Sequence, residues 1–172
     1  MSLALVTSRV GRAWIVLDGV LDPEVPVVSV RDLGIVRDVI ETDSGLTVVV
    51  TPTYSGCPAT EVIEKSIVDA LAADGLGPVR VEMRRAPAWT TDWMSEAGRT
   101  KLREYGIAPP GPVAVPASAP LRFMPRQRPM ALACPRCEST NTERISAFGA
   151  TACKALWRCR ACGEPFEHFK PI

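Results

Sequence analysis

The sequence predicts an α+β protein. It comprises a small two-layer domain, with a three-stranded sheet and helices, and a four-cysteine module at the C-terminal end. Apolar residues in the first part of the chain follow the order helix, strand, strand, helix, strand. Prolines then crowd together, and two Cys-x-x-Cys pairs follow. We therefore expect a domain at residues 1–105, a proline-rich linker at 106–130 and a four-cysteine module at 131–172.

The composition is that of a globular protein, with 47% hydrophobic and 23% charged residues. The net charge of +1 excludes a strong overall field for nucleic acid or an anionic membrane. No apolar run approaches the roughly 18 residues that span a membrane, and the first residues do not resemble an export signal. We expect a cytoplasmic protein whose six cysteines are reduced thiols and metal ligands.

The first element is an amphipathic helix from about Arg9 to Val20. Its apolar stripe consists of Val10, Trp14, Leu17, Val20 and Leu21. Two prolines in the segment from Asp22 to Pro26 then force an extended course. The acids Asp22 and Glu24 are either functional groups or parts of a stiff turn, and the sequence favours neither reading.

Three strands make up the predicted sheet. Residues 35–41 and 46–51 are rich in apolar and β-branched side chains, and a turn at 42–45 joins them. Residues 78–84 alternate apolar and charged side chains, as in a half-buried strand. Between the second and third strands we expect a helix at about 58–73 that ends at Asp74-Gly75. Its buried stripe consists of Val62, Ile63, Ile67, Ala70 and Leu71.

Cys57 is a candidate reactive thiol. Proline is favoured at the first helical position, so Pro58 there would place Cys57 at the N-cap. Free backbone N–H groups and the positive end of the helix dipole favour a thiolate at such a position. The alternative is a small buried residue, because free cysteine is among the most buried residue types.

Trp89 and Trp93 lie in a segment with little periodicity, ahead of a helix that Ser95 or Thr91 caps and that runs to about Tyr105. The two tryptophans are either core residues under a loop or an exposed partner surface. The stiff linker that follows contains Pro109, Pro110, Pro112, Pro116, Pro120, Pro125 and Pro129.

The C-terminal module carries Cys134, Cys137, Cys159 and Cys162. Two residues between thiols allow both sulfurs to reach one ion, and two such corners complete a tetrahedron, as in a zinc ribbon. We expect short strands at 141–148 and 155–158, with Gly149 and Gly163 in turn conformations that other residues avoid. A module this small needs the metal in order to fold. Disulfides, or buried thiols without an ion, are the alternative.

Cys153 lies between the two pairs, as an additional ligand, a core residue or a thiol that passes metal on. His168 is the only histidine, so Cys57 lacks an imidazole base in its own domain, which argues against a papain-like enzyme. Residues 131–172 hold six basic and four acidic residues, too small an excess for strong nucleic-acid binding.

Part of the N-terminal domain resembles the MIP-type family of iron–sulfur assembly proteins, which includes SufT-like factors. The resemblance is carried by residues 22–36, Thr51 and Gly56-Cys57-Pro58. Three further segments are similar to the PaaD subgroup of phenylacetate-degradation proteins, also described as the PaaJ-type subunit of the phenylacetyl-CoA oxygenase complex. These segments are residues 87–93, 101–110 and 148–156.

The resemblance implies an accessory role in maturing the phenylacetyl-CoA 1,2-epoxidase system, not the ring-epoxidising chemistry itself. It implies that Cys57 transiently engages iron or an iron–sulfur cluster and that the four-cysteine set binds metal, either zinc or iron–sulfur. The implied partners are the iron–sulfur reductase or the oxygenase subunits. Because Cys57 alone ligates incompletely, we expect a second ligand from a partner chain or a second copy of this chain. The alternative is a scaffold subunit with a structural zinc ribbon.

Overall fold

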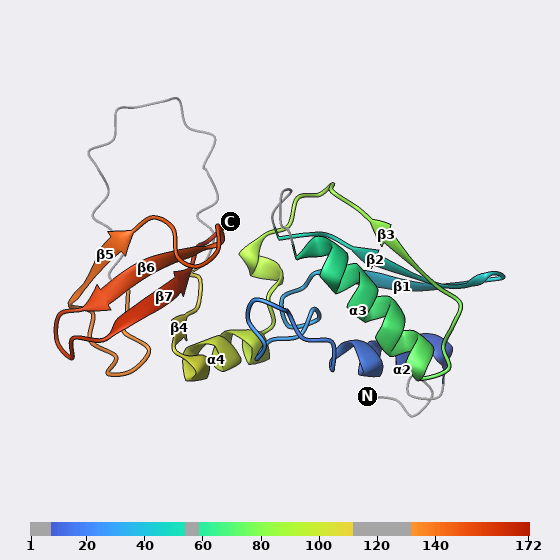
Figure 1. Cartoon of the computed structure of the whole chain (residues 1–172), viewed down its shortest axis with the longest axis horizontal. Helices are drawn as coiled ribbons and strands as arrows, with labels where there is room; N and C mark the ends of the chain where they lie inside the picture. The colour runs from blue at the N-terminus through green and yellow to red at the C-terminus, as the bar shows by residue number, and fades with distance from the viewer. Residues whose placement is uncertain (1–7, 54–58, 112–131) are drawn as a thin grey trace. The chain divides into compact units, whose positions relative to one another are not determined.

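The computed structural model of the chain describes residues 8–53, 59–111 and 132–172 (Figure 1). The chain divides into two compact units, Met1–Lys101 and Leu102–Ile172. Within the described residues, no helix is both long enough and apolar enough to cross a membrane.

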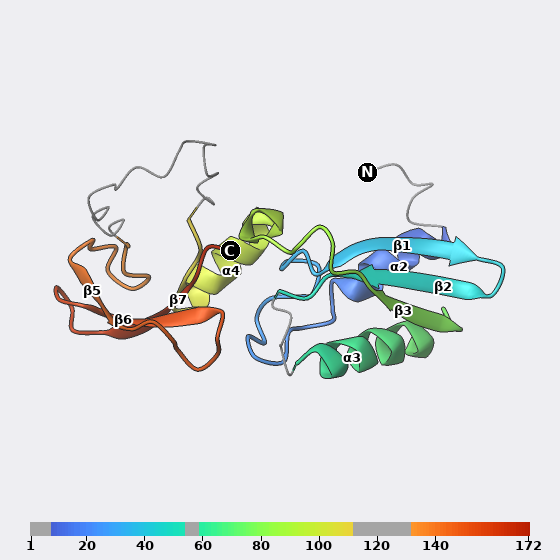
Figure 2. The same ribbon diagram turned by 90° about the horizontal axis from the view of Figure 1, so that it is seen from above.

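The first unit has the predicted two-layer α+β architecture. Its elements in chain order are α2 (Arg9–Leu17), β1 (Val36–Thr42), β2 (Gly45–Val50), α3 (Thr60–Ala73) and β3 (Val79–Met83). β2 is the central strand, antiparallel to β1 and parallel to β3. A parallel pair needs a crossover connection, which α3 supplies. Figure 2 shows α2 beside β1 and α3 beside β3, and the two helices also contact each other.

β2 is buried along both of its faces. Leu46, Val48 and Val50 are at most 1% exposed, and Val49, which points to the opposite face, is 0% exposed. Val48 lies between Val39 of β1 and Val81 of β3 in the register of the sheet. Burial on both faces explains why this strand is a continuous run of valines and not an alternating pattern.

The predicted helices occur, but their buried faces differ from the expectation. In α2 the buried residues are Gly11, Ala13 and Leu17, and the helix ends at Leu17, not at Val20. Leu21 is 46% exposed, so it was wrongly assigned to the stripe. Small residues let a helix approach its neighbours closely. The prediction missed them because it relied on the spacing of large apolar side chains. In α3, the predicted Ile63, Ile67 and Leu71 are buried, whereas Val62 is 51% exposed.

The second unit is built on a four-stranded sheet. α4 (Glu96–Tyr105) spans the division between the units, and the strands are β4 (Ile107–Ala108), β5 (Thr142–Ser146), β6 (Lys154–Cys159) and β7 (Pro165–Phe169). The order is β4-β7-β6-β5, with β6 antiparallel to both of its neighbours and β4 parallel to β7. β5 and β6 correspond to the two predicted strands, whereas β4 and β7 were not predicted.

Two expectations about this unit need correction. Ile107 and Ala108 fall in the range expected to be linker, yet both are buried and form β4. Of the two glycines expected in special turn conformations, Gly163 has a φ of 82°, but Gly149 has no positive φ. A Cβ at Gly149 would lie 2.6 Å from Glu167 Oε1, so the end of that side chain would have to shift. Most of the expected linker, residues 112–131, lies outside the described residues.

Candidate metal centre

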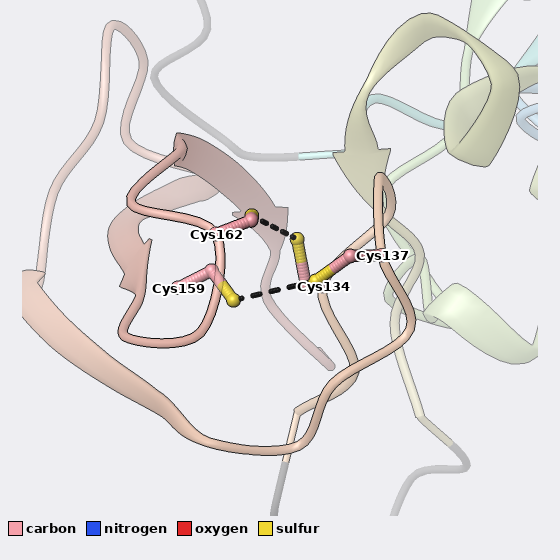
Figure 3. A group of neighbouring side chains, drawn as sticks. All are labelled: Cys134, Cys137, Cys159 and Cys162. Carbon is pink, nitrogen blue, oxygen red and sulfur yellow. Dashed lines mark hydrogen bonds between the residues drawn. The ribbon is translucent and has the colours of Figure 1, made fainter.

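Four cysteine sulfurs converge at one end of the second unit (Figure 3). Cys134 and Cys137 lie in a turn ahead of β5, Cys159 ends β6, and Cys162 lies in the turn ahead of β7. All four Sγ atoms lie within 4.8 Å of one another. The Sγ atoms of Cys134 and Cys162 are 3.9 Å apart, and those of Cys137 and Cys159 are 3.6 Å apart. The sequence prediction that these four cysteines form one group is therefore confirmed.

The two Cys-x-x-Cys turns share one backbone pattern. The Glu138 N–H donates to the Cys134 carbonyl, as the Gly163 N–H does to the Cys159 carbonyl, both at 2.9 Å. One residue beyond each turn, the Ser139 and Glu164 carbonyls accept from the N–H groups of Cys134 and Cys159. The residue that follows each second cysteine has a positive φ, 60° for Glu138 and 82° for Gly163. The two turns are thus equivalent halves of one site.

The protonation of the sulfurs indicates that the group suits a cation. Hydrogen bonds from the backbone N–H groups of Cys162 and Ala161 lower the pKa of Cys159 to about 7. The backbone N–H of Ser139 also favours a thiolate at Cys137, but the neighbouring thiols of Cys162 and Cys159 raise the pKa of Cys137 to about 12. Closely spaced thiolates repel one another, so all four ionise together only around a positive ion.

The spacing of the sulfurs fits one tetrahedral ion. Metal–sulfur bonds of about 2.3 Å place tetrahedral thiolates about 3.8 Å apart, which agrees with the observed distances of 3.6 and 3.9 Å. An iron–sulfur cluster distributes its thiolates over several irons and therefore needs a wider spacing. Four protein ligands leave no open position for a substrate, which is the arrangement of a structural site.

The surroundings of the group are partly apolar and partly charged. Cys134 and Cys159 are buried with Phe166 and Ala108, and Leu132 and Trp157 pack against them. On the adjoining strands, Glu143 binds Arg160 and Arg158, and these two guanidinium groups lower the pKa of the Glu143 carboxyl to about 2. This clamp ties β5 to the end of β6 that carries Cys159.

Comparisons with known proteins agree with this geometry. The family described as the PaaD zinc beta ribbon domain matches residues 120–170, and the family described as iron-sulfur cluster assembly protein matches residues 13–83. A protein of Escherichia coli that is named as a putative subunit of 1,2-phenylacetyl-CoA epoxidase is 48% identical over 164 residues, covering 95% of this chain and 94% of that protein. The chain belongs to the PaaD family.

Two further similarities concern the first unit of this PaaD-family chain. An Fe-S protein maturation auxiliary factor of Porphyromonas gingivalis is 35% identical over 85 residues, which are 48% of this chain and 80% of that protein. A crystal structure of a domain of unknown function, DUF59, from Bacillus anthracis superposes with a TM-score of 0.51 at 25% identity. It covers 55% of this chain and 91% of that chain, so the first unit has the DUF59 fold.

Among the described residues of the PaaD-family chain, one further cysteine stands apart from the metal centre. Cys153 directly precedes β6, whereas Cys159 ends it, so the two lie about 20 Å apart along the strand. Cys153 is not part of the four-sulfur group, and its Sγ lies 3.1 Å from Thr151 Oγ1. Cys57 lies outside the described residues. α3 begins at Thr60 with Ala59 at the N-cap, later than the expected start at residue 58, and the expected cap at Cys57 stays a prediction.

The Asp22 carboxylate organises the turn that follows it. Asp22 Oδ1 accepts hydrogen bonds from the N–H groups of Glu24 and Val25, at 2.9 and 2.8 Å. Of the two readings of this segment, functional acids or a stiff turn, the hydrogen bonds match the turn. Asp22 forms an Asx turn, which accounts for an aspartate at this position.

Trp89 and Trp93 secure the turn at residues 31–34. Trp89 is 4% exposed, and its Nε1 donates to the Leu33 carbonyl at 2.9 Å. Trp93 is half-buried, and the Arg37 guanidinium lies 3.6 Å from the centroid of its ring. Trp89 is therefore a core residue, as in the first of the two sequence alternatives.

Sequence reasoning missed a polar cluster around Asp32. This carboxylate is 8% exposed and accepts from Ser29 N–H, Ser95 Oγ and Lys101 Nζ, the last at 2.6 Å. Burial alone would raise the pKa of Asp32, but hydrogen bonds from Lys101, Ser29 and Ser95 outweigh it and lower the pKa. Ser95, which the sequence identified as a helix cap, also accepts from the Gly98 N–H at 2.9 Å. The cluster holds the start of α4 against the turn.

Proposed function

We propose that this protein is an accessory maturation factor for the iron or iron–sulfur centres of the phenylacetyl-CoA 1,2-epoxidase system in aerobic phenylacetate degradation. The observation that carries the proposal is the presence, on one chain, of an iron–sulfur assembly domain and a PaaD ribbon. Each alone would support only part of it. The Escherichia coli relative is named as an epoxidase subunit, and the Porphyromonas gingivalis relative as an Fe–S maturation factor.

In this proposal Cys57 is the thiol that carries iron or a cluster on its way to a recipient. A sulfur that must release its cargo should be accessible, ionised and incompletely supported by other protein ligands. Residues 1–101 contain no other cysteine and no histidine. A second soft ligand therefore comes from a partner chain or from a second copy of this chain. The recipients are the reductase or the oxygenase subunits.

The four-cysteine group has a different role. Cys134, Cys137, Cys159 and Cys162 would hold one zinc ion, which the sulfur spacing fits. Bound zinc supplies free energy for folding and no redox chemistry. The backbone N–H groups of Cys162 and Ala161 favour a thiolate at Cys159, and the Glu143 clamp joins β5 to the end of β6.

The first prediction tests Cys57. Cys57→Ser replaces a soft thiolate by a hydroxyl that binds iron poorly, so epoxidase activity and the iron–sulfur content of the reductase should fall by about tenfold or more in cells that carry the variant. Cys153→Ser, a cysteine outside the metal group, is the matched control and should leave both unchanged. Unchanged iron content and activity in the Cys57→Ser strain would refute the maturation role.

The alternative is a non-catalytic scaffold subunit, which the name of the Escherichia coli relative as a subunit favours. The two functions differ in the accessibility of Cys57. A carrier thiol reacts rapidly with a maleimide in the native protein, whereas a buried one reacts only after unfolding. Labelling should be followed by peptide mass spectrometry, because Cys153 reacts independently.

A further inference from the structure

The loop between β5 and β6 presents an exposed aromatic ring. Phe148 is 65% exposed, and Ile145, at the end of β5, is 53% exposed. Phe148 has the highest exposure among the large apolar side chains of the described residues. This loop lies at the start of β6, whereas the cysteines lie at its end, so the two features occupy opposite ends of the ribbon (Figure 1). Exposed aromatic residues of this kind are typical of protein interfaces.

The loop is held by an ion pair between a buried lysine and a half-buried glutamate. Lys154 is 4% exposed, and its Nζ lies 2.6 Å from Glu167 Oε2. The other oxygen of Glu167 accepts the Ala150 N–H at 2.8 Å, and Gly149 N–H donates to the Lys154 carbonyl at 2.8 Å. A buried ion pair contributes little net stability, because desolvation offsets the attraction. Its contacts here instead fix the backbone that follows the exposed ring.

Lys170 holds the ring itself. Its Nζ lies 4.6 Å from the centroid of Phe148 and 3.4 Å from the Ala147 carbonyl. The Lys170 N–H also donates to the Cys153 carbonyl at 2.9 Å, which joins the end of β7 to the loop. A side chain that is ordered before binding loses little conformational entropy when a partner arrives.

One basic side chain beside the exposed ring has no acidic partner among the described residues. The ion pairs of the ribbon join Arg136 to Glu164, Arg158 and Arg160 to Glu143, and Lys154 to Glu167. Of the six basic residues at 131–172, Arg144 and Lys170 remain without an ion pair among the described residues. Arg144 lies opposite Trp157 within the sheet, whereas Lys170 lies over Phe148 at the loop. Glu138, the acid without an ion pair in that same set, follows Cys137 at the other end.

We propose that Phe148, Ile145 and Lys170 form a docking surface for another protein of the epoxidase system. The partner presents an apolar pocket for the phenyl ring, with a carboxylate at its rim that pairs with Lys170. The inference rests on the proposed function, because it takes the partner from that system. It assigns the ribbon the task of recognition and leaves iron or cluster handling to Cys57.

The test measures binding of the full-length, metal-loaded protein to the purified reductase and oxygenase subunits by biolayer interferometry. Phe148→Ala should weaken the affinity by about tenfold or more, and Lys170→Glu by a similar factor. Higher salt should weaken the wild type more than Lys170→Glu, because the variant has lost part of the charge attraction. Tyr105→Ala, which removes another exposed ring of the same unit (54% exposed), is the matched control and should bind normally. Metal content and circular dichroism establish that the variants are folded.

Three outcomes would overturn the docking surface. They are wild-type affinity in both variants, failure of the wild type to bind any of the subunits, and Phe148-dependent binding of single-stranded nucleic acid instead of a subunit. Cys57→Ser separates this inference from the proposed function, because it should bind subunits normally. If Phe148→Ala loses binding while Cys57→Ser still supports iron loading, the docking surface stands and the carrier role fails. If Phe148→Ala binds normally while Cys57→Ser abolishes iron loading, the carrier role stands and the docking surface fails.

Discussion

Gly34 closes the turn at residues 31–34 with a φ of 68°. A Cβ at this position would lie 2.4 Å from the Trp93 carbonyl oxygen, a backbone atom that cannot rotate away. Glycine is therefore required for two reasons: the backbone has a positive φ, and there is no room for a Cβ. The clash means that the Trp93 segment can close over the turn only if residue 34 has no side chain.

Gly34→Ala is predicted to lower the free energy of unfolding of the first unit by about 3 kcal/mol or more, because strain and a backbone clash add. Gly75→Ala is the matched control, since Gly75 has a φ of 72° but no atom within 4 Å of the position that a Cβ would take. The control should lose only about 1 kcal/mol. Urea unfolding followed by tryptophan fluorescence measures both. Equal losses would show that the contact with Trp93 does not form in solution.

His168 makes the stability of the second unit depend on pH. Its ring packs edge-on against Trp157 at 6.1 Å, and burial lowers the pKa of His168 to about 4. An unfolded histidine titrates near pH 6.5. Between pH 6.5 and about 4, the unfolded chain therefore binds a proton that the folded chain does not bind, so the stability from this group falls as the pH falls.

His168→Gln should remove this part of the pH dependence. We expect the difference in unfolding free energy between wild type and variant to change by about 1–2 kcal/mol between pH 7 and pH 4.5, less than the full shift implies because the ring is partly exposed. Thermal unfolding of the two metal-loaded proteins in parallel measures it. Protonation of the cysteines affects both proteins alike, so parallel pH profiles would contradict the assignment.

At the scale of elements, local sequence patterns predicted the helices and strands that are determined by neighbouring residues. The pair of β1 and β2 follows from β-branched runs around a glycine turn, and α4 follows from its Ser95 cap. β4 was missed because two residues carry no periodic signal, and the strand exists only through pairing with β7. The buried face of α2 was misassigned because Gly11 and Ala13, not the larger side chains, provide the close packing.

Some features of the candidate site could be predicted from the sequence, and others could not. Four cysteines at ligand spacing predict the metal group, since the chemistry of the ligands dictates both type and separation. The sequence does not reveal that Glu138 repeats the left-handed conformation of Gly163, because glutamate carries no preference for it. The Asp32 cluster joins residues far apart in sequence, so only the folded chain brings Lys101 to the carboxylate.

At the scale of the whole molecule, the two units differ in what stabilises them. The first unit has a core built around β2, with many fully buried aliphatic side chains. Around the cysteines, the core cluster of the second unit is confined to a few residues, two of which are the ligands Cys134 and Cys159. A small core of this kind cannot offset the loss of chain entropy without the ion.

Metal removal should therefore unfold the ribbon and leave the first unit intact. Structural zinc contributes about 10–16 kcal/mol in small domains at neutral pH, more than the stability of a small fold. Metal analysis of anaerobically purified protein should give one zinc per chain and no visible colour. After chelation, amide NMR signals from 132–172 should collapse to unfolded positions while those from the first unit persist. Cys159→Ser should also unfold the ribbon, because Cys159 belongs to the four-sulfur group. Cys153→Ser should leave it folded, because Cys153 lies outside that group. A metal-free chain that keeps dispersed ribbon signals would show that packing alone, without thiolate ligation, folds the module.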